Sequence, residues 1–184
     1  MKNVWTTIAT RPITAADAER YRGILQRTTS EDRYCRFFHF VDHFDEEFVH
    51  DFVRVRPDAI GFIAEEGTEA LGAAHAFSLG DGRAELAIVV ARDARRRGVG
   101  RALVERIKAE LQASAHSALV AYALGANAGF SRLARSAGMR SRGSESGVTT
   151  WEFACVPASS DRSLSTCFGD AAGLQFGGTA ADER

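Results

Sequence analysis

The sequence is poor in cysteine and contains no long hydrophobic run. Its three cysteines, Cys35, Cys155 and Cys167, are scattered and show no CxxC spacing. That pattern argues against a disulfide framework and a zinc site, and it favours a reducing compartment. No apolar stretch approaches the ~18 residues that a membrane-spanning helix needs, and the opening MKNVWTT has no signal-peptide core. We therefore expect a cytoplasmic protein with neither a membrane partner nor a bound metal.

Lysine is scarce, and the net charge is close to zero. All but two of the 23 basic residues are arginines, the exceptions being Lys2 and Lys108, and the formal net charge is −1. This balance excludes, as first expectations, a polybasic nucleic-acid binder and an acidic solvating protein. A genomic bias towards arginine accounts for the total, so the positions where arginines cluster carry the information.

The chain length and composition predict one domain followed by a tail. The 184 residues, 45% of them hydrophobic, suffice for one sizeable core but not for two full domains. We expect that domain over residues 1–156. From Pro157 the composition shifts to Ala, Gly, Ser and Asp, so the tail 157–184 is expected to be disordered or to lie loosely on the domain. Its isolated apolar residues could make a dimer contact, which leaves the oligomeric state open.

Apolar periodicity predicts a mixture of helices and strands. Thr14 and Asp17 have the spacing of a capping box, and Ser30 is the expected N-cap of a second, short helix. Helices are expected at residues 14–27, 31–38, 45 to about 56, 99–111 and 131–136. Strands are expected at residues 4–13, 60–65, 70–79, 84–90, 119–124 and 148–156. Antiparallel hairpins followed by one strand–helix–strand crossover indicate an α+β (mixed α/β) protein.

The segment from Val89 to Ala102 is the most informative. A buried strand enters a loop with four arginines, at positions 92, 95, 96 and 97, and the loop opens an amphipathic helix. The first turn of a helix carries unpaired N–H groups, and Gly98 and Gly100 let a phosphate approach the backbone. The alternative is a solvated basic loop with an ordinary glycine turn. A P-loop and a dinucleotide fingerprint fit worse, because the spacing is Arg-x-x-Gly-x-Gly and follows an antiparallel meander.

This segment resembles motif A of the GNAT superfamily of N-acetyltransferases, whose pattern is Gln/Arg-x-x-Gly-x-Gly/Ala. Arg95, Gly98 and Gly100 match it, and Asn127, Leu133 and Gly138-Met139 are similar to the family's later Asn…Leu-Tyr…Gly-Phe segment. The resemblance covers roughly residues 4–156. It implies a GNAT fold, with a central, mostly antiparallel twisted sheet of six to seven strands flanked by helices. It also implies an N-acetyltransferase that takes its acetyl group from acetyl-CoA.

The resemblance assigns residues to the coenzyme A site. Backbone amides after the arginine would hold the pyrophosphate, the strand before the loop would pair with the pantetheine arm, and the asparagine would contact that arm. The implied set is Ile88, Val89, Val90, Arg95, Arg96, Arg97, Gly98, Val99, Gly100, Arg101 and Asn127. Two departures stand out. Ala134 occupies the position of the family's tyrosine, so the general acid that reprotonates the thiolate is unassigned, and Met139 replaces the usual phenylalanine.

Two further segments resemble one branch of the family. Residues 31–38 (EDRYCRFF) and 84–87 (AELA) are similar to motifs of the bacterial Pat-like protein-lysine acetyltransferases. The resemblance to this branch implies a protein lysine as the acceptor. A small amine or an antibiotic-like polyamine is the alternative acceptor, and a non-catalytic coenzyme-A-binding sensor is an alternative of another class.

Glu85 is the first choice for the general base. It lies in an otherwise apolar strand, on the same face as Ala87 and Val89, and apolar surroundings raise a carboxylate's affinity for a proton. The alternative is a solvent-facing strand glutamate at the start of an exposed edge. A backbone N–H near Val89 or Val90 would polarise the thioester carbonyl. His75 is the second candidate, although a lone histidine among alanines is more often a hydrogen-bonded core group.

The acceptor side is predicted from two groups of residues. The aromatic group is expected to form core and cleft wall: Tyr34, Phe37, Phe38, Phe40 and Phe44. His39 and His43, at the end of this Phe-rich helix, are expected at most to line or cover the acceptor cleft. The acidic group could attract a cationic acceptor: Asp42, Asp45, Glu46, Glu47 and Asp51. The acidic residues could equally be helix N-terminal charges and a solvated face.

Overall fold

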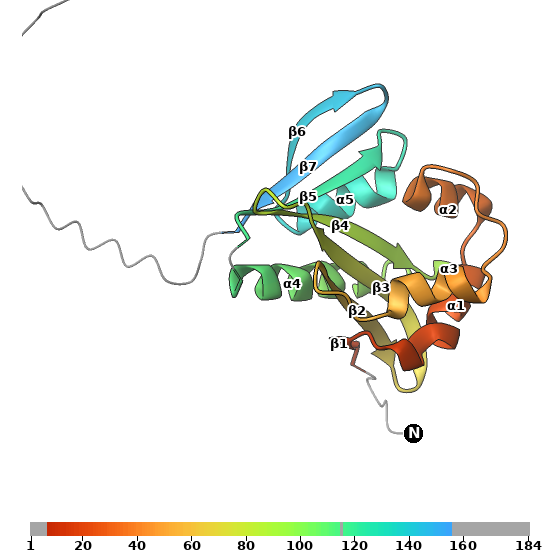
Figure 1. Cartoon of the computed structure of the whole chain (residues 1–184). Helices are drawn as coiled ribbons and strands as arrows, with labels where there is room; N and C mark the ends of the chain where they lie inside the picture. The colour runs from red at the N-terminus through yellow and green to blue at the C-terminus, as the bar shows by residue number, and fades with distance from the viewer. Residues whose placement is uncertain (1–6, 115, 156–184) are drawn as a thin grey trace, which may run out of the picture.

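A computed structural model describes residues 7–114 and 116–155 and shows one seven-stranded sheet (Figure 1). The strand order is β1-β2-β3-β4-β5-β7-β6, and only the β4–β5 pair is parallel. The strands are β1 (Ala9–Pro12), β2 (Ala59–Glu66), β3 (Glu69–Ser78), β4 (Arg83–Val90), β5 (Ala118–Leu124), β6 (Arg140–Glu145) and β7 (Val148–Ala154). The helices are α1 (Ala18–Gln26), α2 (Ser30–Phe37), α3 (Glu46–Val53), α4 (Val99–Gln112) and α5 (Ala128–Ser136). The predicted α+β class and the mostly antiparallel sheet are confirmed.

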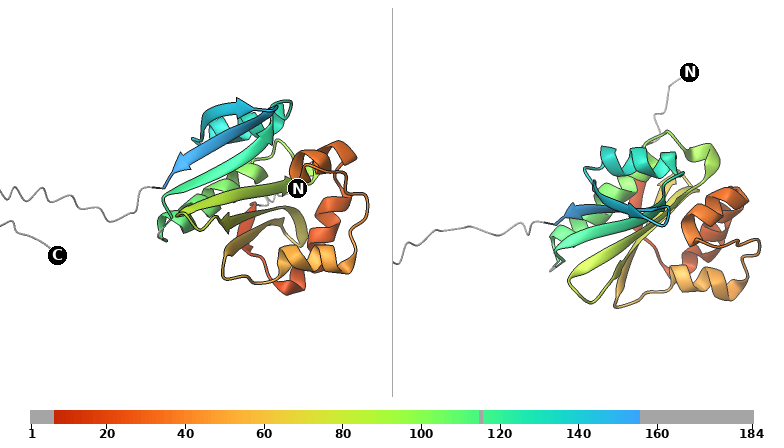
Figure 2. Two further views of the ribbon diagram at one scale, coloured as in Figure 1. Left: turned by 45° about the horizontal axis from the view of Figure 1, so that its top comes forward. Right: turned by 90° about the horizontal axis from the view of Figure 1, so that it is seen from above.

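The helices cover the sheet on two sides (Figure 2). Alternation along β4 directs Glu85, Ala87 and Val89 to the side of α1–α3, where Tyr21 of α1 lies edge-on to His75 of β3 at 6.0 Å. The other face packs on α4, where Arg106 lies over the Phe62 ring of β2 at 4.8 Å. Within the described residues, no helix is both long enough and apolar enough to cross a membrane.

Local capping explains where the first helices begin. Asp17 accepts hydrogen bonds from the Thr14 N–H (2.8 Å) and hydroxyl (3.0 Å), so the predicted capping pair forms, although it opens a 3-10 turn that precedes α1. The predicted Ser30 cap is wrong. Thr29 is the N-cap of α2, since its hydroxyl accepts from the Asp32 N–H at 3.1 Å and the Asp32 carboxylate accepts in return at 2.9 Å.

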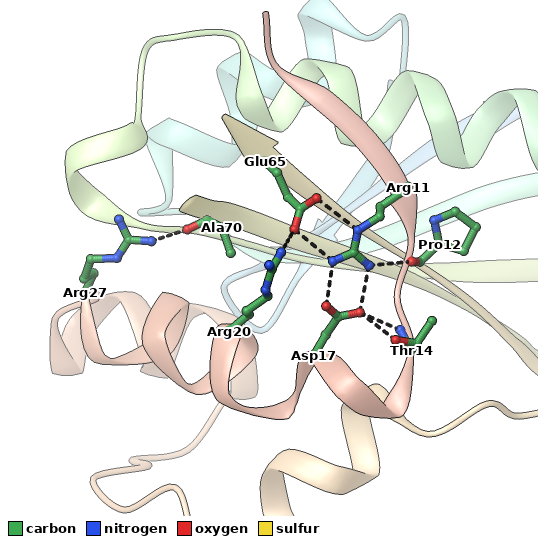
Figure 3. Close-up of polar contacts among 8 residues, drawn as sticks. All are labelled: Arg11, Pro12, Thr14, Asp17, Arg20, Arg27, Glu65 and Ala70. Carbon is green, nitrogen blue, oxygen red and sulfur yellow. Dashed lines mark hydrogen bonds and ion pairs between the residues drawn. The ribbon is translucent and has the colours of Figure 1, made fainter. Parts of the chain in front are cut away.

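An arginine-centred cluster fastens β1 to β2 and to the start of α1 (Figure 3). Arg11 donates to both carboxylate oxygens of Asp17, at 2.8 and 2.6 Å, and to both of Glu65, at 2.9 and 2.8 Å. Arg20 of α1 also pairs with Glu65. The Arg11 hydrogen bonds lower the pKa of the buried Asp17 carboxyl to about 2. This cluster lies at the β1 edge of the sheet. Its residues are far from the arginine-rich loop in the sequence.

One strand was not predicted from the sequence, and some element boundaries differ from the predicted ones. β6 (Arg140–Glu145) was not expected, because all six of its residues are exposed and show no apolar alternation. The first strand is shorter than predicted, beginning at Ala9. Residues 4–6 of that prediction, residue 156 of the last strand and the whole predicted tail 157–184 lie outside the described residues.

Candidate active site

β4 separates from β5 halfway along its length, and Figure 1 shows the two strands diverging. They pair only at Arg83–Ala118, Ala84–Leu119 and Glu85–Val120. On its other side, β4 stays paired with β3 as far as Val90. The edge of residues 86–90 that faces β5 therefore has no sheet partner in the described chain. A strand held on one edge and open on the other can pair with an extended, amide-containing ligand, which is the role predicted for Ile88, Val89 and Val90.

The open strand leads directly into a row of unpaired backbone amides. In the part of the chain that the structure describes, no acceptor contacts the N–H groups of residues 96–101, and pairing resumes where the Ala102 N–H donates to the Gly98 carbonyl at 2.9 Å. We call these six N–H groups the phosphate cradle. Positive φ at Arg96 (65°) and Gly98 (91°) turns the chain there. Successive free amides at a helix N-terminus attract an anion, so the geometry suits a pyrophosphate.

The two glycines of the loop have different local roles. A Cβ at Gly98 would touch nothing within 4 Å, so glycine is needed there for its positive φ. A Cβ at Gly100 would lie 3.2 Å from Leu133 Cδ2, so this glycine also lets α4 pack closely on α5. The spacing that predicted phosphate binding thus serves helix packing as well.

Arg95 connects the loop to α2. Its guanidinium lies 2.8 Å from the Asp32 carboxylate and 3.4–3.5 Å from the Val90 carbonyl oxygen. Burial alone would raise the pKa of Asp32, but the hydrogen bonds from Arg95 and Thr29 hold it below its usual value. The loop after β4 and α2 are therefore joined by an ion pair.

The remaining loop arginines divide into paired and unpaired. Arg97 forms an ion pair with Glu66. Arg92, Arg96 and Arg101 are exposed and contact no carboxylate among the residues that the structure places. These three charges are available to an anionic ligand.

Asn127 and the two departures from the family pattern have structural roles. The Asn127 Oδ1 caps α5 by accepting from the Phe130 N–H at 2.9 Å, which leaves its amide NH2 for a ligand contact. Ala134 is fully buried and Met139 is 4% exposed, and both belong to the core. The predicted contact of Asn127 with the pantetheine arm stays a prediction.

Glu85 lies where β4 begins to open. It is half-buried, it is opposite Phe77 in β3 and Val120 in β5, and no hydrogen-bond partner contacts its carboxylate among residues 7–114 and 116–155. β4 is the fourth of seven strands and is paired on both sides at Glu85, and the edge facing β5 becomes open from the next residue. A carboxylate here is close to the open strand edge and free to interact with a ligand.

His75, the second candidate base, is a core residue. It is 4% exposed, and its Nε2 donates to the Phe52 carbonyl oxygen at 2.7 Å. Burial, helped by the nearby positive charge of Arg36, lowers the pKa of His75 to about 4. The ring is therefore neutral near pH 7 and already uses its proton on Nε2.

The predicted aromatic group forms both core and surface. Phe37 packs on Phe48 and Phe52, with ring centroids 5.4 and 5.8 Å apart, while Phe38 and Phe40 are 42% and 72% exposed. Three members lie as follows: Tyr34 packs on Phe40 at 4.9 Å, Phe44 packs on Phe48 at 5.9 Å, and the exposed His39 Nδ1 is 2.8 Å from the Phe37 carbonyl. His43 is exposed between α2 and α3.

Most of the predicted acidic group is used locally. Asp45 caps α3 by accepting from the Phe48 N–H at 2.8 Å. Other members form ion pairs: Asp42 with Arg33 at 3.2 Å, Glu46 with His50 at 3.5 Å, and Asp51 with Arg54 at 3.3 Å. The reading as cap charges and a solvated face accounts for these contacts, while Glu47 is exposed.

Sequence reasoning overlooked Arg36, which it used only as part of a motif match. The residue is half-buried, its Nε is shielded from solvent, and its guanidinium carbon lies 4.8 Å from the Phe37 ring centroid and 5.5 Å from that of Phe52. The one available signal was its place on a short helix whose aromatic neighbours were expected to be buried. No spacing rule links Arg36 on α2 with Phe52 on α3, since the fold brings the two helices together.

Comparison with known proteins agrees with this geometry. A family model described as "Acetyltransferase (GNAT) family" matches residues 24–138, more than half of the chain. The GNAT domain of S. lividans PAT is 27% identical, with a TM-score of 0.74 over 84% of this chain and 99% of that chain. The ribosomal-protein-alanine N-acetyltransferase of Brucella melitensis is 22% identical, with a TM-score of 0.65 over 79% of this chain and 99% of that chain.

The ribosomal-protein-S18-alanine N-acetyltransferase of Escherichia coli is 17% identical, with a TM-score of 0.65 over 84% of this chain and 98% of that chain. At this level of identity it shares the fold, as the Brucella protein does. The family match adds the activity class, because it includes the loop, the open strand and Asn127. The chain therefore belongs to the GNAT family, and it is an acyltransferase that uses acetyl-CoA as its co-substrate.

Proposed function

We propose that this enzyme transfers the acetyl group of acetyl-CoA to the side-chain amine of a protein lysine. The observation that carries the proposal is the continuity of three features along β4 and the loop that follows it. Glu85 lies at the start of the opening, the unpaired edge of residues 86–90 follows, and the phosphate cradle comes next. An extended ligand with a pyrophosphate at one end and a thioester at the other fits that order.

The chemistry needs one base and one polarising donor. Glu85, directly or through water, takes one proton from the lysine ammonium, and the neutral nitrogen attacks the thioester carbonyl carbon. A backbone N–H near Val89 or Val90 stabilises the oxyanion. The N–C bond forms as the C–S bond breaks, and the thiolate takes up a second proton from the nitrogen. The products are an acetylated lysine, coenzyme A and one released proton.

Two observations support a protein acceptor over a small amine. The S. lividans PAT domain is 27% identical, and the match covers 84% of this chain and 99% of that chain. Segments 31–38 and 84–87 also resemble the lysine-acetylating branch. In addition, Phe38 and Phe40 expose large aromatic surfaces at the end of α2. Exposed aromatic surface next to a site is typical of a macromolecular contact. A small-molecule amine and a non-catalytic sensor are the alternative functions.

The acceptor is tested with acetyl-CoA and a matched panel. Thiol release is measured with unstructured lysine peptides, a folded lysine-rich protein and polyamines, and acetyl-lysine is located by mass spectrometry. Transfer to lysine Nζ supports the proposal, while transfer to polyamines alone contradicts it. Calorimetric binding of acetyl-CoA without release on any acceptor would favour the sensor.

A further inference from the structure

Phe38 follows α2 in a backbone conformation that disfavours a large side chain. Its φ of 60° and ψ of 12° are left-handed, and its N–H donates to the Tyr34 carbonyl oxygen at 2.8 Å. Glycine usually occupies this position after a helix, because a Cβ is disfavoured there. The Phe38 ring is also 42% exposed. A large apolar side chain held in a strained conformation at the surface indicates a contact with a ligand or partner.

The N-terminal end of α2 is fixed where the open strand edge ends. Arg95 lies 2.8 Å from the carboxylate of Asp32, in the first turn of α2, and 3.4–3.5 Å from the carbonyl oxygen of Val90, the last residue of β4. α2 also contacts both β4 and β5, and it lies beside the place where the two strands diverge (Figures 1 and 2). The helix therefore begins near the phosphate cradle.

The C-terminal end of α2 lies closer to the start of the opening. Phe37, the last residue of the helix, packs on Phe52 of α3 with ring centroids 5.8 Å apart. The Phe52 ring in turn lies 6.0 Å from that of His75, and His75 is opposite Ala87 in β4. Ala87 is on the same face of β4 as Glu85, two residues along the strand. α2 therefore runs beside the open edge in the direction opposite to β4, and its C-cap is at the end nearer to Glu85.

The segment that follows Phe38 has the charge to attract an ammonium group. Residues 39–53 contain five carboxylates and neither lysine nor arginine. Two of these carboxylates, on Asp42 and Asp51, pair with arginines at 3.2 and 3.3 Å, and the other three have no lysine or arginine partner in the described chain. A lysine side chain combines a methylene stem with an ammonium group, so it suits an aromatic face next to negative charge.

We propose that the Phe38 ring is an acceptor contact, which packs on the methylene stem of the lysine whose nitrogen reaches Glu85. Such a contact removes apolar surface of both partners from water, and a ring has few torsions to fix on binding. It should strengthen acceptor binding and leave acetyl-CoA binding alone, because the phosphate cradle is at the other end of the open edge. The inference rests on the proposed function, since it names a residue that contacts that reaction's acceptor.

The kinetic test compares Phe38→Gly, Phe38→Tyr and Val55→Gly with the wild type, using an unstructured lysine peptide. F38G should raise the KM for the peptide about 5- to 30-fold and leave the KM for acetyl-CoA within about twofold. F38Y keeps the ring and should stay within about twofold of the wild type for both substrates. The matched control is V55G, which removes an apolar side chain that is 88% exposed beyond the end of α3. An unchanged peptide KM in F38G, or an equal rise in V55G, would overturn the proposal.

The acceptor stem provides a second test. Replacing the peptide lysine by ornithine removes one methylene group. This change should raise the peptide KM of the wild type more than that of F38G, because the glycine variant has no ring for the stem to contact. Equal changes in the two proteins would overturn the proposal.

A third readout does not depend on transfer. The midpoint of urea unfolding of F38G should stay within about 0.5 M of the wild type, because glycine suits a φ of 60° and this gain offsets the lost ring packing. A larger fall would show that the ring supports the fold, and would overturn the proposal. Absence of transfer to any lysine by the wild type would instead overturn the proposed function, and this inference with it.

Discussion

The loop after β4 and the helical layer over the middle of β4 are built from different parts of the chain. The phosphate cradle consists of backbone N–H groups from residues 96–101, set by positive φ at two positions. The centre near Glu85 consists of a half-buried side chain of β4 whose carboxylate has no hydrogen-bond or ion-pair partner in the described structure. The first arrangement binds a ligand whatever side chains surround it, whereas the second depends on individual groups. Substitutions in the two regions should therefore change different kinetic constants.

The largest effect is expected at Glu85. Glu85→Gln should lower kcat by about 10²–10⁴-fold, because a general base contributes on this scale, while acetyl-CoA binding stays within about twofold. Turnover is followed by thiol release and binding by calorimetry. Glu152→Gln, on the same sheet, serves as the control. An active E85Q would remove this residue from the mechanism and erase the contrast between the two regions.

A substitution outside both regions should change stability and leave both constants alone. Asp17→Asn removes the carboxylate that Arg11 holds at 2.8 and 2.6 Å. Because folding lowers the pKa of Asp17 from 3.8 to about 2, the ionised group stabilises the fold by about 2 kcal/mol above pH 5. That contribution is lost as the pH falls from about 4 to about 2.

Urea unfolding of wild type and D17N from pH 2 to pH 7 measures this term. The two stability curves should be separated at pH 7 and should converge near pH 2. Curves that stay parallel over that range would show that the Arg11–Asp17 contact does not account for the lowered pKa. kcat and KM at pH 7 and 25 °C should match the wild type.

Gly98→Ala should weaken acetyl-CoA binding and spare the chemical step. Alanine at a φ of +91° costs roughly 1–2 kcal/mol, which corresponds to a loss of affinity of about 5- to 30-fold if the loop moves. kcat at saturating acetyl-CoA should change little. Gly23→Ala is the matched control, because a Cβ there touches nothing within 4 Å and its φ is not positive. Equal affinities for G98A and G23A would show that the backbone of the loop does not form the cradle.

The smallest effect is expected at the charges around the cradle. Arg96 is exposed and unpaired in the described chain, whereas Arg97 pairs with Glu66. Arg96→Gln should weaken acetyl-CoA binding by about two- to fivefold at low salt, and the loss should shrink at 300 mM salt. Arg97→Gln should weaken it less, since that charge is partly neutralised. The reverse order in salt-dependent calorimetry would contradict the division into paired and unpaired arginines.

The same difference explains how much the sequence could predict. The cradle could be predicted because a backbone site leaves a local signature, here Gly98 and Gly100 directly after a buried strand. The hairpins and the α4 helix were predicted for a similar reason, since apolar periodicity is local. β6 was missed because its exposed RSRGSE segment has no such period. Thr29 and Ser30 both cap helices well, so the choice between them depended on the position of Asp32.

The side-chain centre could be predicted only in part. Glu85 stood out as a charge in an apolar strand, but its open partner side depended on β5 pairing with only three residues of β4. The sequence could not show that His75 is a core residue, because its partner, the Phe52 carbonyl oxygen 2.7 Å from Nε2, lies on another element. Arg36 carries no local signature at all, because its aromatic neighbour Phe52 comes from another helix.

The central claim is that binding and chemistry are carried separately by the cradle and by Glu85. The most direct test measures acetyl-CoA affinity by calorimetry, and kcat with one lysine acceptor, for wild type, E85Q and G98A side by side. The account predicts that E85Q binds acetyl-CoA as wild type does but turns over at least about 100-fold more slowly. It predicts that G98A binds weakly but turns over normally at saturation. Loss of affinity in E85Q, or equal losses of kcat in both variants, would contradict it.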